Sequence, residues 1–263
     1  MAPPVALTIA GSDSGGGAGI QADLKTFAAH RCFGTSVITA ITAQNTRGVT
    51  DVHQVPTQTV ASQLAAVLDD LPVAAVKTGM LGSPEIADHL AGFAAAGRLP
   101  NLVVDPVLVS TTGYELGVVA AIERLLPYAL VVTPNVAEAA ALTGQKVTTL
   151  DEMAEAAAAL GERGARYVVV TGGDLPEPAD EVVEAVWTAG QVELVRGPRV
   201  PTRHNHGSGC TFSAAIAANL AYSQQVPAAI AAAKSYVAKA MAGSAHWQLG
   251  GGIGPLDHGV TPD

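Results

Sequence analysis

Short apolar runs alternate with longer amphipathic stretches along the whole chain. The first run, residues 5–10, reads Val-Ala-Leu-Thr-Ile-Ala and ends at glycine. A short run that is almost entirely apolar is typical of a strand buried on both faces. Further strands are predicted at 35–43, 73–76, 102–104, 130–132 and 167–170.

Apolar residues recur at helical spacing between these runs, as within residues 59–71. Ser83 and Pro84 mark a helix start, because serine caps free N–H groups and proline fits the first turn. Residues 181–196 predict a hairpin that turns at Ala189-Gly190. Strands that alternate with helices predict an α/β fold whose mostly parallel sheet is covered on both faces. The predicted helices cover 21–30, 59–71, 117–126, 136–142, 150–163, 211–222 and 227–243, with one more from Ser83.

Composition narrows the class of protein. The 263 residues are 49% hydrophobic and 14% charged, so the chain can bury a sizeable core. The rhythm of strands and helices is unbroken, which predicts a single domain over residues 1–263. Net charge is −9, from 14 Lys and Arg against 23 Asp and Glu, and no basic run appears. This balance argues against a nucleic-acid partner.

Cysteine usage and the N-terminus point to the cytoplasm. Cys32 and Cys210 are too few for a disulfide framework, and no Cys/His set has zinc spacing. The N-terminus lacks the basic and long apolar segments of a signal peptide. No apolar stretch reaches the about 18 residues of a membrane span. We therefore expect a cytoplasmic protein with no membrane partner.

Polar and glycine residues stand at the carboxyl ends of the predicted strands, where ligands of such sheets bind. The first loop, Gly11 to Gly19, is a glycine-rich turn from strand to helix. It fits neither the dinucleotide fingerprint nor the phosphate-loop motif, because the glycine offsets differ and Gly-Lys-Ser/Thr is absent. The loop allows close approach of a small ligand to the backbone. A flexible turn without a ligand is the alternative.

Oxygen-bearing side chains follow two further strands. Asp105 comes after the run at 102–104, and Asn135 and Glu138 come after the run at 130–132. Such oxygens suit Mg²⁺ carried by a nucleotide. The alternatives are a turn residue before proline for Asp105 and an exposed helix charge for Glu138.

The segment from His206 to Thr211 reads His-Gly-Ser-Gly-Cys-Thr and opens an alanine-rich helical pattern. A helix N-terminus leaves backbone N–H groups unpaired and carries partial positive charge, which makes an anion site. We expect Cys210 to favour its thiolate there, as either a nucleophile or a general base. The alternative is an inert buried thiol, an interpretation that suits Cys32 better.

Six segments carry a resemblance to a known family: Gly11 to Phe27, Thr42 to Thr46, Val76 to Leu81, Val104 to Val107, His206 to Thr211 and Gly254 to His258. In this order they resemble the bacterial hydroxymethylpyrimidine/phosphomethylpyrimidine kinases of thiamine biosynthesis. The resemblance covers essentially the whole chain.

The resemblance implies a ribokinase-like three-layer αβα sandwich with a mostly parallel central sheet. It implies ATP and Mg²⁺ as cofactors. It also implies phosphoryl transfer to 4-amino-5-hydroxymethyl-2-methylpyrimidine and then to its monophosphate. A pyridoxal or pyridoxine kinase of the same fold and a ligand-binding relative without turnover are the alternatives. We expect small-molecule partners and a homodimer.

The resemblance further implies roles for single residues. Cys210 stands in the place of the superfamily's aspartate base, and the backbone amides of Gly207, Ser208, Gly209 and Cys210 are implied to stabilise the transferring phosphoryl group. Gln44 matches the glutamine that binds the pyrimidine. The implied pocket also includes Gly11, Ala18, Asp23, Met80 and Val107.

The implied nucleotide and metal residues follow the later strands. Asn135 and Glu138 match the Asn-x-x-Glu motif that organises Mg²⁺ and phosphate. The metal candidates are Asp105 and Glu138, and the nucleotide candidates are Asn135, Glu138, Thr171 and Gly173.

Two stretches depart from the family pattern. Residues 171–174 read Thr-Gly-Gly-Asp where the family often has Lys-Gly-Gly-His, so a cation expected near the nucleotide phosphates is missing. The flap at residues 108–113 also lacks the family's lysine, and Ser110 stands where some pyridoxal-phosphorylating relatives carry a cysteine. These losses bear most on the second phosphorylation and on the rate.

Overall fold

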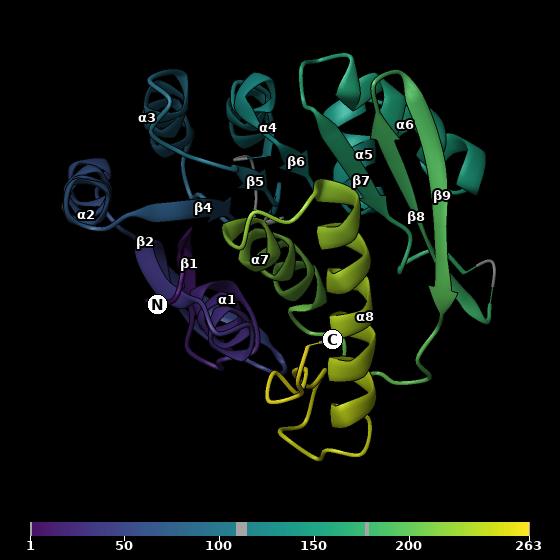
Figure 1. Cartoon of the computed structure of the whole chain (residues 1–263). Coiled ribbons are helices and arrows are strands. Elements are labelled where there is room, and N and C mark those ends of the chain that lie inside the picture. Colours follow the sequence, from purple (N-terminus) through teal and green to yellow (C-terminus); the bar gives the residue numbers. More distant parts are fainter. Residues whose placement is uncertain (1, 109–114, 177–178, 263) are drawn as a thin grey trace.

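A single sheet runs through the centre of the molecule (Figure 1). The structure, a computed structural model, describes residues 2–108, 115–176 and 179–262. In this part of the chain the sheet has nine strands in the order β3-β2-β1-β4-β5-β6-β7-β8-β9. The strands are β1 (Val5–Asp13), β2 (Phe33–Asn45), β3 (Gly48–Gln54), β4 (Val73–Thr78), β5 (Val103–Val104), β6 (Val131–Val132), β7 (Tyr167–Thr171), β8 (Glu181–Thr188) and β9 (Gln191–Pro198).

The six strands predicted from apolar runs form the parallel centre of the sheet. β2, β1, β4, β5, β6 and β7 pair in parallel. The antiparallel strands lie at the edges: β3 pairs with β2, and the hairpin β8–β9 extends the sheet beyond β7. Ala189 and Gly190 both have positive φ, 48° and 82°, which is the backbone that a two-residue hairpin turn requires.

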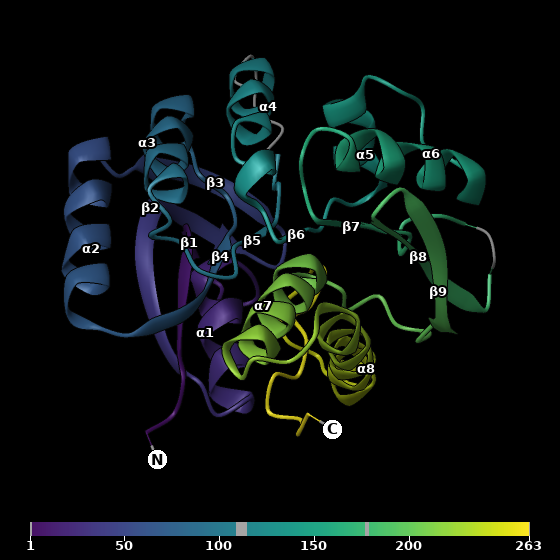
Figure 2. The ribbon, with the colours of Figure 1, turned by 45° about the horizontal axis from the view of Figure 1, so that its top comes forward.

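Helices cover both faces of the sheet, as Figure 2 shows. One face carries α2 (Thr57–Asp70), α3 (Pro84–Ala95), α4 (Glu115–Glu123), α5 (Val136–Thr143) and α6 (Leu150–Gly161). The other carries α1 (Gly19–Ala29), α7 (Ser208–Ala221) and α8 (Val226–Ser244). A separate apolar core fills each side, one around Leu7 and Leu64 and one around Phe27 and Tyr236. The predicted three-layer αβα fold is confirmed.

Strand β3 and the start of helix α7 are among the differences from the sequence prediction, as is a 3₁₀ helix at Leu126–Tyr128. Strand β3 was not predicted, because all seven of its residues are exposed and it has no buried face to impose an apolar pattern. Helix α7 begins at Ser208, three residues before the predicted start at Thr211. The predicted cap at Ser83 is confirmed, since its hydroxyl accepts a hydrogen bond from the N–H of Ile86 at 3.3 Å.

Residues 109–113 of the predicted flap, Ser110 among them, lie outside the described residues. Among the residues that are described, no helix is long and apolar enough to cross a membrane.

Candidate active site

The chemical groups predicted at separate strand ends meet at one edge of the sheet. The N–H of Asp105 donates to the carbonyl of Thr78 at 3.0 Å, and the N–H of Thr133 donates to that of Val104 at 3.0 Å. The backbone of Asn135 then bridges to Thr171. These bonds continue the parallel register past the last residues of β4, β5 and β6. The edge therefore presents Asp105 and Asn135 beside each other.

Gly207 makes the turn into α7 possible. Its φ is +84°, and a Cβ there would collide with the carbonyl of Gly17. The first intrahelical hydrogen bond runs from the N–H of Thr211 to the carbonyl of Gly207 at 2.9 Å. The start of α7 is thereby packed directly against the glycine-rich loop after β1.

The prediction that all the amides from Gly207 to Cys210 are available to an anion needs a correction. The N–H of Ser208 already donates to the carbonyl of Asn205 at 3.1 Å, because the approach to the helix closes in a turn. Gly209 and Cys210 lie in the first helical turn, where N–H groups have no acceptor four residues earlier in the helix. The anion site therefore rests on these two amides and on the helix dipole.

The prediction of a favoured thiolate at Cys210 is wrong for the free protein. The side chain is half-buried, and desolvation raises the pKa of the thiol to about 12. The charge of Lys77 and the N–H of Gly19 favour the thiolate, but the carboxylates of Asp105 and Asp23 oppose them. A helix N-terminus alone does not outweigh that environment, so Cys210 holds its proton at neutral pH.

A buried ion-pair network lies beneath α7. The ammonium of Lys77 is 2.9 Å from Oδ2 of Asp23 and 3.6 Å from Oδ2 of Asp105. Oγ1 of Thr8 donates to Asp23 at 2.6 Å. Asp23 is 0% exposed, so the structure places it under the predicted pocket and not on its lining. The hydroxyl of Ser213 in α7 donates to Asp105 at 2.9 Å.

Asp13 holds the glycine-rich loop in shape. Its carboxylate accepts hydrogen bonds from the backbone N–H groups of Gly15, Gly17 and Ala18 at 2.7–3.0 Å. Nε2 of His206 lies 3.0 Å from the same carboxylate. Desolvation opposes the charge of Asp13, but these hydrogen bonds outweigh it and lower the pKa. Sequence reasoning missed Asp13 and gave His206 no role, because spacing along the chain does not reveal that they meet.

The predicted pyrimidine pocket gathers around this loop. The side chain of Gln44 is half-buried, with its amide nitrogen 3.4 Å from Nε2 of His206 and its oxygen 3.1 Å from Oγ1 of Thr42. Gly11 lies directly against the methyl end of Met80, where a Cβ would not fit. Ala18 is tied to this group through its hydrogen bond to Asp13. Val107 follows the end of β5, with its N–H donating to the carbonyl of Asp105 at 2.9 Å.

Asn135 and Glu138 form a capping box at the start of α5. Each side chain accepts from the other residue's N–H at 2.9 Å. Desolvation, followed by the charge of Asp105, raises the pKa of Glu138 to about 8. A carboxylate whose pKa is raised by a neighbouring carboxylate suits a divalent cation, whose charge offsets that repulsion. The hydroxyl of the buried Thr133, two positions before Asn135, has no hydrogen-bond partner among the described residues.

These residues fit Mg²⁺ that arrives with a nucleotide. The described residues contain no group of three or more His, Cys, Asp or Glu side chains arranged to hold a metal ion. Mg²⁺ ordinarily keeps several waters and binds one or two carboxylates plus substrate phosphates. Asp105 and Glu138 could supply the one or two carboxylates that Mg²⁺ takes from the protein when it also binds phosphates.

Thr171 is the last residue of β7, and Gly173 lies on the loop that follows it. The guanidinium of Arg199 donates to the carbonyl of Gly173 at 2.8 Å and to that of Leu175 at 2.9 Å. Arg199 thus brings a positive charge to the loop that lacks the family's lysine, while Asp174 brings a negative charge close enough to raise the pKa of Glu138. Sequence reasoning missed Arg199 because it belongs to a later segment.

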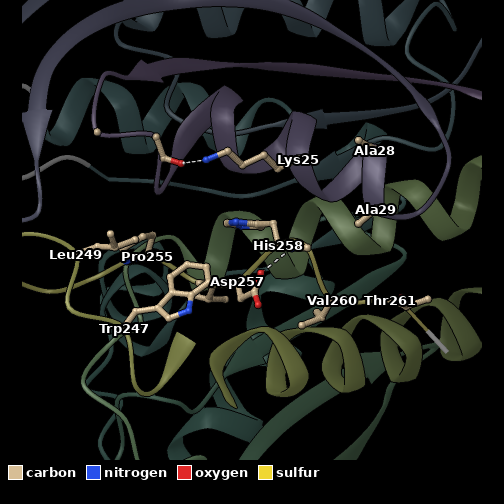
Figure 3. A pocket seen from close by; sticks show the side chains of 14 residues that line it. Lys25, Ala28, Ala29, Trp247, Leu249, Pro255, Asp257, His258, Val260 and Thr261 are labelled. Carbon is tan, nitrogen blue, oxygen red and sulfur yellow. Dashed lines mark hydrogen bonds between the residues drawn. The ribbon is translucent and has the colours of Figure 1, made fainter. Parts of the chain in front are cut away.

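A cavity of about 600 Å³ lies between the glycine-rich loop, helix α1 and the C-terminal tail (Figure 3). Helix α1 contributes Lys25 to its wall, and the C-terminal tail contributes Trp247 and His258. None of the predicted site residues lines it. Nε2 of His258 pairs with Oγ1 of Thr211 at 2.9 Å, next to Cys210. The tail therefore packs down to support the start of α7.

A mostly parallel sheet covered by helices on both faces, with carboxylates at neighbouring strand ends, is the fold of the ribokinase-like class of phosphotransferases. The phosphomethylpyrimidine kinase family model matches residues 13–257. The chain is 48% identical over 263 residues to the hydroxymethylpyrimidine/phosphomethylpyrimidine kinase of Streptomyces coelicolor, covering 98% of this chain and 96% of that protein. The chain belongs to the phosphomethylpyrimidine kinase family.

Solved structures agree with this assignment. The Bacillus subtilis pyridoxal kinase in complex with ADP has a TM-score of 0.91 at 38% identity, covering 97% of each chain. The phosphomethylpyrimidine kinase of Clostridium difficile has a TM-score of 0.78 at 38% identity, covering 90% of this chain and 99% of that one. Both kinds of vitamin kinase thus share this fold.

Replacing Gly207 by alanine should destabilise the protein. The left-handed backbone alone costs about 1–2 kcal/mol with a Cβ, and the collision with Gly17 adds to this cost. Thermal unfolding should show a Tm lower by at least about 3 °C. Gly92→Ala is the matched control, because a Cβ at Gly92 in α3 meets nothing within 4 Å. Equal Tm values for the two variants would contradict the strained turn.

Alkylation of Cys210 should be slow at neutral pH and should keep accelerating above pH 9. The reason is that its pKa is raised to about 12 from 9.0, so the reactive thiolate becomes common only at high pH. The rate of iodoacetamide labelling, measured by mass spectrometry in a Cys32→Ser background, tests this expectation. A rate that levels off below pH 9 contradicts it, and unfolded protein gives the reference curve of an ordinary thiol.

Proposed function

We propose that this protein transfers the γ-phosphoryl group of ATP, with Mg²⁺, to the hydroxymethyl group of 4-amino-5-hydroxymethyl-2-methylpyrimidine. A second transfer to the monophosphate then gives the diphosphate used in thiamine biosynthesis. Full-length similarity to kinases named for these two substrates is the observation that carries the proposal. We propose that residues 1–263 form one kinase domain. We also propose that the protein acts in the cytoplasm, where ATP is available.

The pyrimidine alcohol occupies the pocket beside the glycine-rich loop. Gln44 supplies an amide for the ring's polar edge, and His206, fixed by Asp13, supports it. Gly11 and Met80 give the flat ring a close apolar surface, with Ala18 and Val107 completing the lining. Small residues near the ring keep backbone and ligand in contact.

The nucleotide and its metal lie toward β6 and β7. Asp105 and Glu138 hold Mg²⁺ through oxygen atoms, which neutralises charge on the phosphates. Asn135, Thr171 and Gly173 face the phosphates on the same edge of the sheet. Arg199, bound to the carbonyl of Gly173, supplies the cation that the missing lysine does not.

The transfer takes place at the turn from Gly207 to Cys210. The alcohol oxygen attacks the γ-phosphorus, the bond to the β–γ bridging oxygen breaks, and the amides of Gly209 and Cys210 stabilise the transferring group. Positioning and charge neutralisation supply most of the rate. Cys210 accepts the alcohol's proton as a thiolate, and no covalent phosphoenzyme forms. Because its pKa is raised in the free protein, turnover should increase with pH.

A mass-resolved assay with ATP, Mg²⁺ and the hydroxymethylpyrimidine tests this function. We expect mono- and diphosphate products, with a higher kcat/KM for the pyrimidine than for pyridoxal. A strong preference for pyridoxal would establish the alternative kinase, and no product at saturating substrate would indicate a ligand-binding relative. Cys210→Ser should lower kcat by about 10²-fold or more if the thiolate is the base. Near-normal turnover in that variant excludes this role.

We also propose that the protein forms a homodimer through the β2–β3 edge. Ile41, Val49 and Val52 are 51%, 45% and 40% exposed there, and every residue of β3 is exposed. Exposed apolar residues on an open sheet edge favour pairing with another chain.

Val52→Lys should convert the dimer to a monomer, because it places a charge on that apolar edge. Light scattering after size-exclusion chromatography measures the mass. Leu194→Lys on β9 is the matched control, since Leu194 is an exposed residue of the opposite sheet edge. A wild-type monomer, or a Val52→Lys dimer, would exclude this interface.

A further inference from the structure

Lys77 is a buried cation to which neither the motifs nor the proposed reaction gives a role. Its side chain is 0% exposed and is among the largest fully buried side chains of the described residues. A buried charge is expensive unless it is paired and hydrogen-bonded. The groups that pair with Lys77 therefore indicate which part of the protein its charge acts on.

Two carboxylates from different layers hold the ammonium. Both oxygens of Asp23 in α1 accept from it, at 3.0 and 2.9 Å, and Asp105 at the end of β5 lies 3.6 Å away. The backbone closes over the same atom, because a Cβ at Gly79 would stand 2.9 Å from it. The ammonium is fixed in position by these neighbours.

Contacts continue from this cation to the start of α7. Ser213 donates to Asp105 at 2.9 Å, and its Oγ lies 3.0 Å and 3.1 Å from the carbonyl oxygens of Gly209 and Cys210. Gly209 and Cys210 carry the two amides assigned to the phosphoryl group. One short chain of contacts thus joins Lys77 to the metal candidate Asp105 and to the anion site.

We propose that Lys77 is a positioning residue for phosphoryl transfer: it holds Asp105 in place and keeps a fixed positive charge beneath Gly209 and Cys210. This inference rests on the proposed kinase activity. A preorganised charge in a site without water stabilises developing negative charge more strongly than the same charge in solvent.

The electrostatic contact with Cys210 agrees with this role. Desolvation alone lowers the pKa of Lys77, but the charges of Asp23, Cys210 and Asp105 outweigh it and raise the pKa. Stability does not require such a pair, because apolar side chains of similar size commonly replace a buried ion pair without loss. The presence of the Lys77–Asp23 ion pair at this edge of the sheet is consistent with a role in the reaction.

The test removes both charges of the pair at once, as D23N/K77M. K77M alone would leave both Asp23 and Asp105 without their lysine, whereas in the double variant Asp23 is neutral as well and Asp105 keeps its hydrogen bond from Ser213. We expect it to fold, as judged by circular dichroism and thermal unfolding, with a kcat about 10²-fold lower and KM values within about threefold of wild type. A kcat close to wild type, or a change confined to KM, would overturn the proposal.

The matched control is E184Q/K234M. Lys234 in α8 and Glu184 in β8 form the other lysine–carboxylate pair with little exposure among the described residues, outside the candidate site. This variant should keep kcat within about threefold of wild type. An equal loss of kcat in the control would show that removing any buried pair slows turnover, and it would overturn the proposal.

Ser213→Ala gives a second test that does not depend on folding of the double variant, because alanine is favourable in a helix. It cuts the contact between Asp105 and α7, and kcat should fall by about tenfold with KM unchanged. An unchanged kcat overturns the proposed link.

Labelling of Cys210 separates this proposal from the proposed function. In a Cys32→Ser background at fixed pH, iodoacetamide should react more slowly with the D23N/K77M variant, because the charge of Lys77 favours the thiolate more strongly than the charge of Asp23 opposes it. An unchanged rate overturns the placement of Lys77. This readout needs no turnover, so it holds even if the wild type makes no pyrimidine phosphate, which would refute the proposed function alone.

Discussion

The charge of Lys77 has no contact with solvent, and the layers around it are arranged to neutralise it. Asp23 reaches it from α1, Asp105 from the end of β5, and Thr8 completes the hydrogen bonds of Asp23. An unpaired ion at this depth would cost more than most single interactions contribute to a fold. The positions of α1, β4 and β5 are therefore coupled, and Asp105 is placed where a metal-bound phosphate is expected.

Close backbone approach is the second constraint, and glycine makes it possible. Gly207 and Gly17 bring the start of α7 against the loop after β1, where a side chain at Gly207 would collide. His206 then reaches Asp13, and the same imidazole lies beside Gln44. The proposed pyrimidine pocket and the proposed anion site are therefore adjacent, which suits transfer of a phosphoryl group between two bound molecules.

Local patterns predicted most of the fold. The inner parallel strands, from β1 to β7, are largely buried, so their residues are mostly apolar, and the helices between them carry one apolar face. Strand β3 was missed because it lies exposed at the edge of the sheet and is held by backbone hydrogen bonds to β2. In the site, the residues at strand ends and before α7 were found because glycine turns and helix starts have local signatures. Asp13, Lys77, Ser213 and Arg199 were not assigned roles, because their partners are distant in sequence.

The sequence by itself determined the order of strands and helices, the turn before α7 and the edge of the sheet that carries the chemistry, since each depends on neighbouring residues. Only the tertiary structure decided the charge states of the buried groups and the residues with which they pair. Cys210 has the local setting of a thiolate, yet desolvation raises the pKa of its thiol to about 12. The family resemblance implies that Asp23 lines the pocket, yet its side chain lies buried against Lys77. Desolvation and Coulomb energy depend on distances between elements far apart in the chain, and only the folded protein brings those elements together.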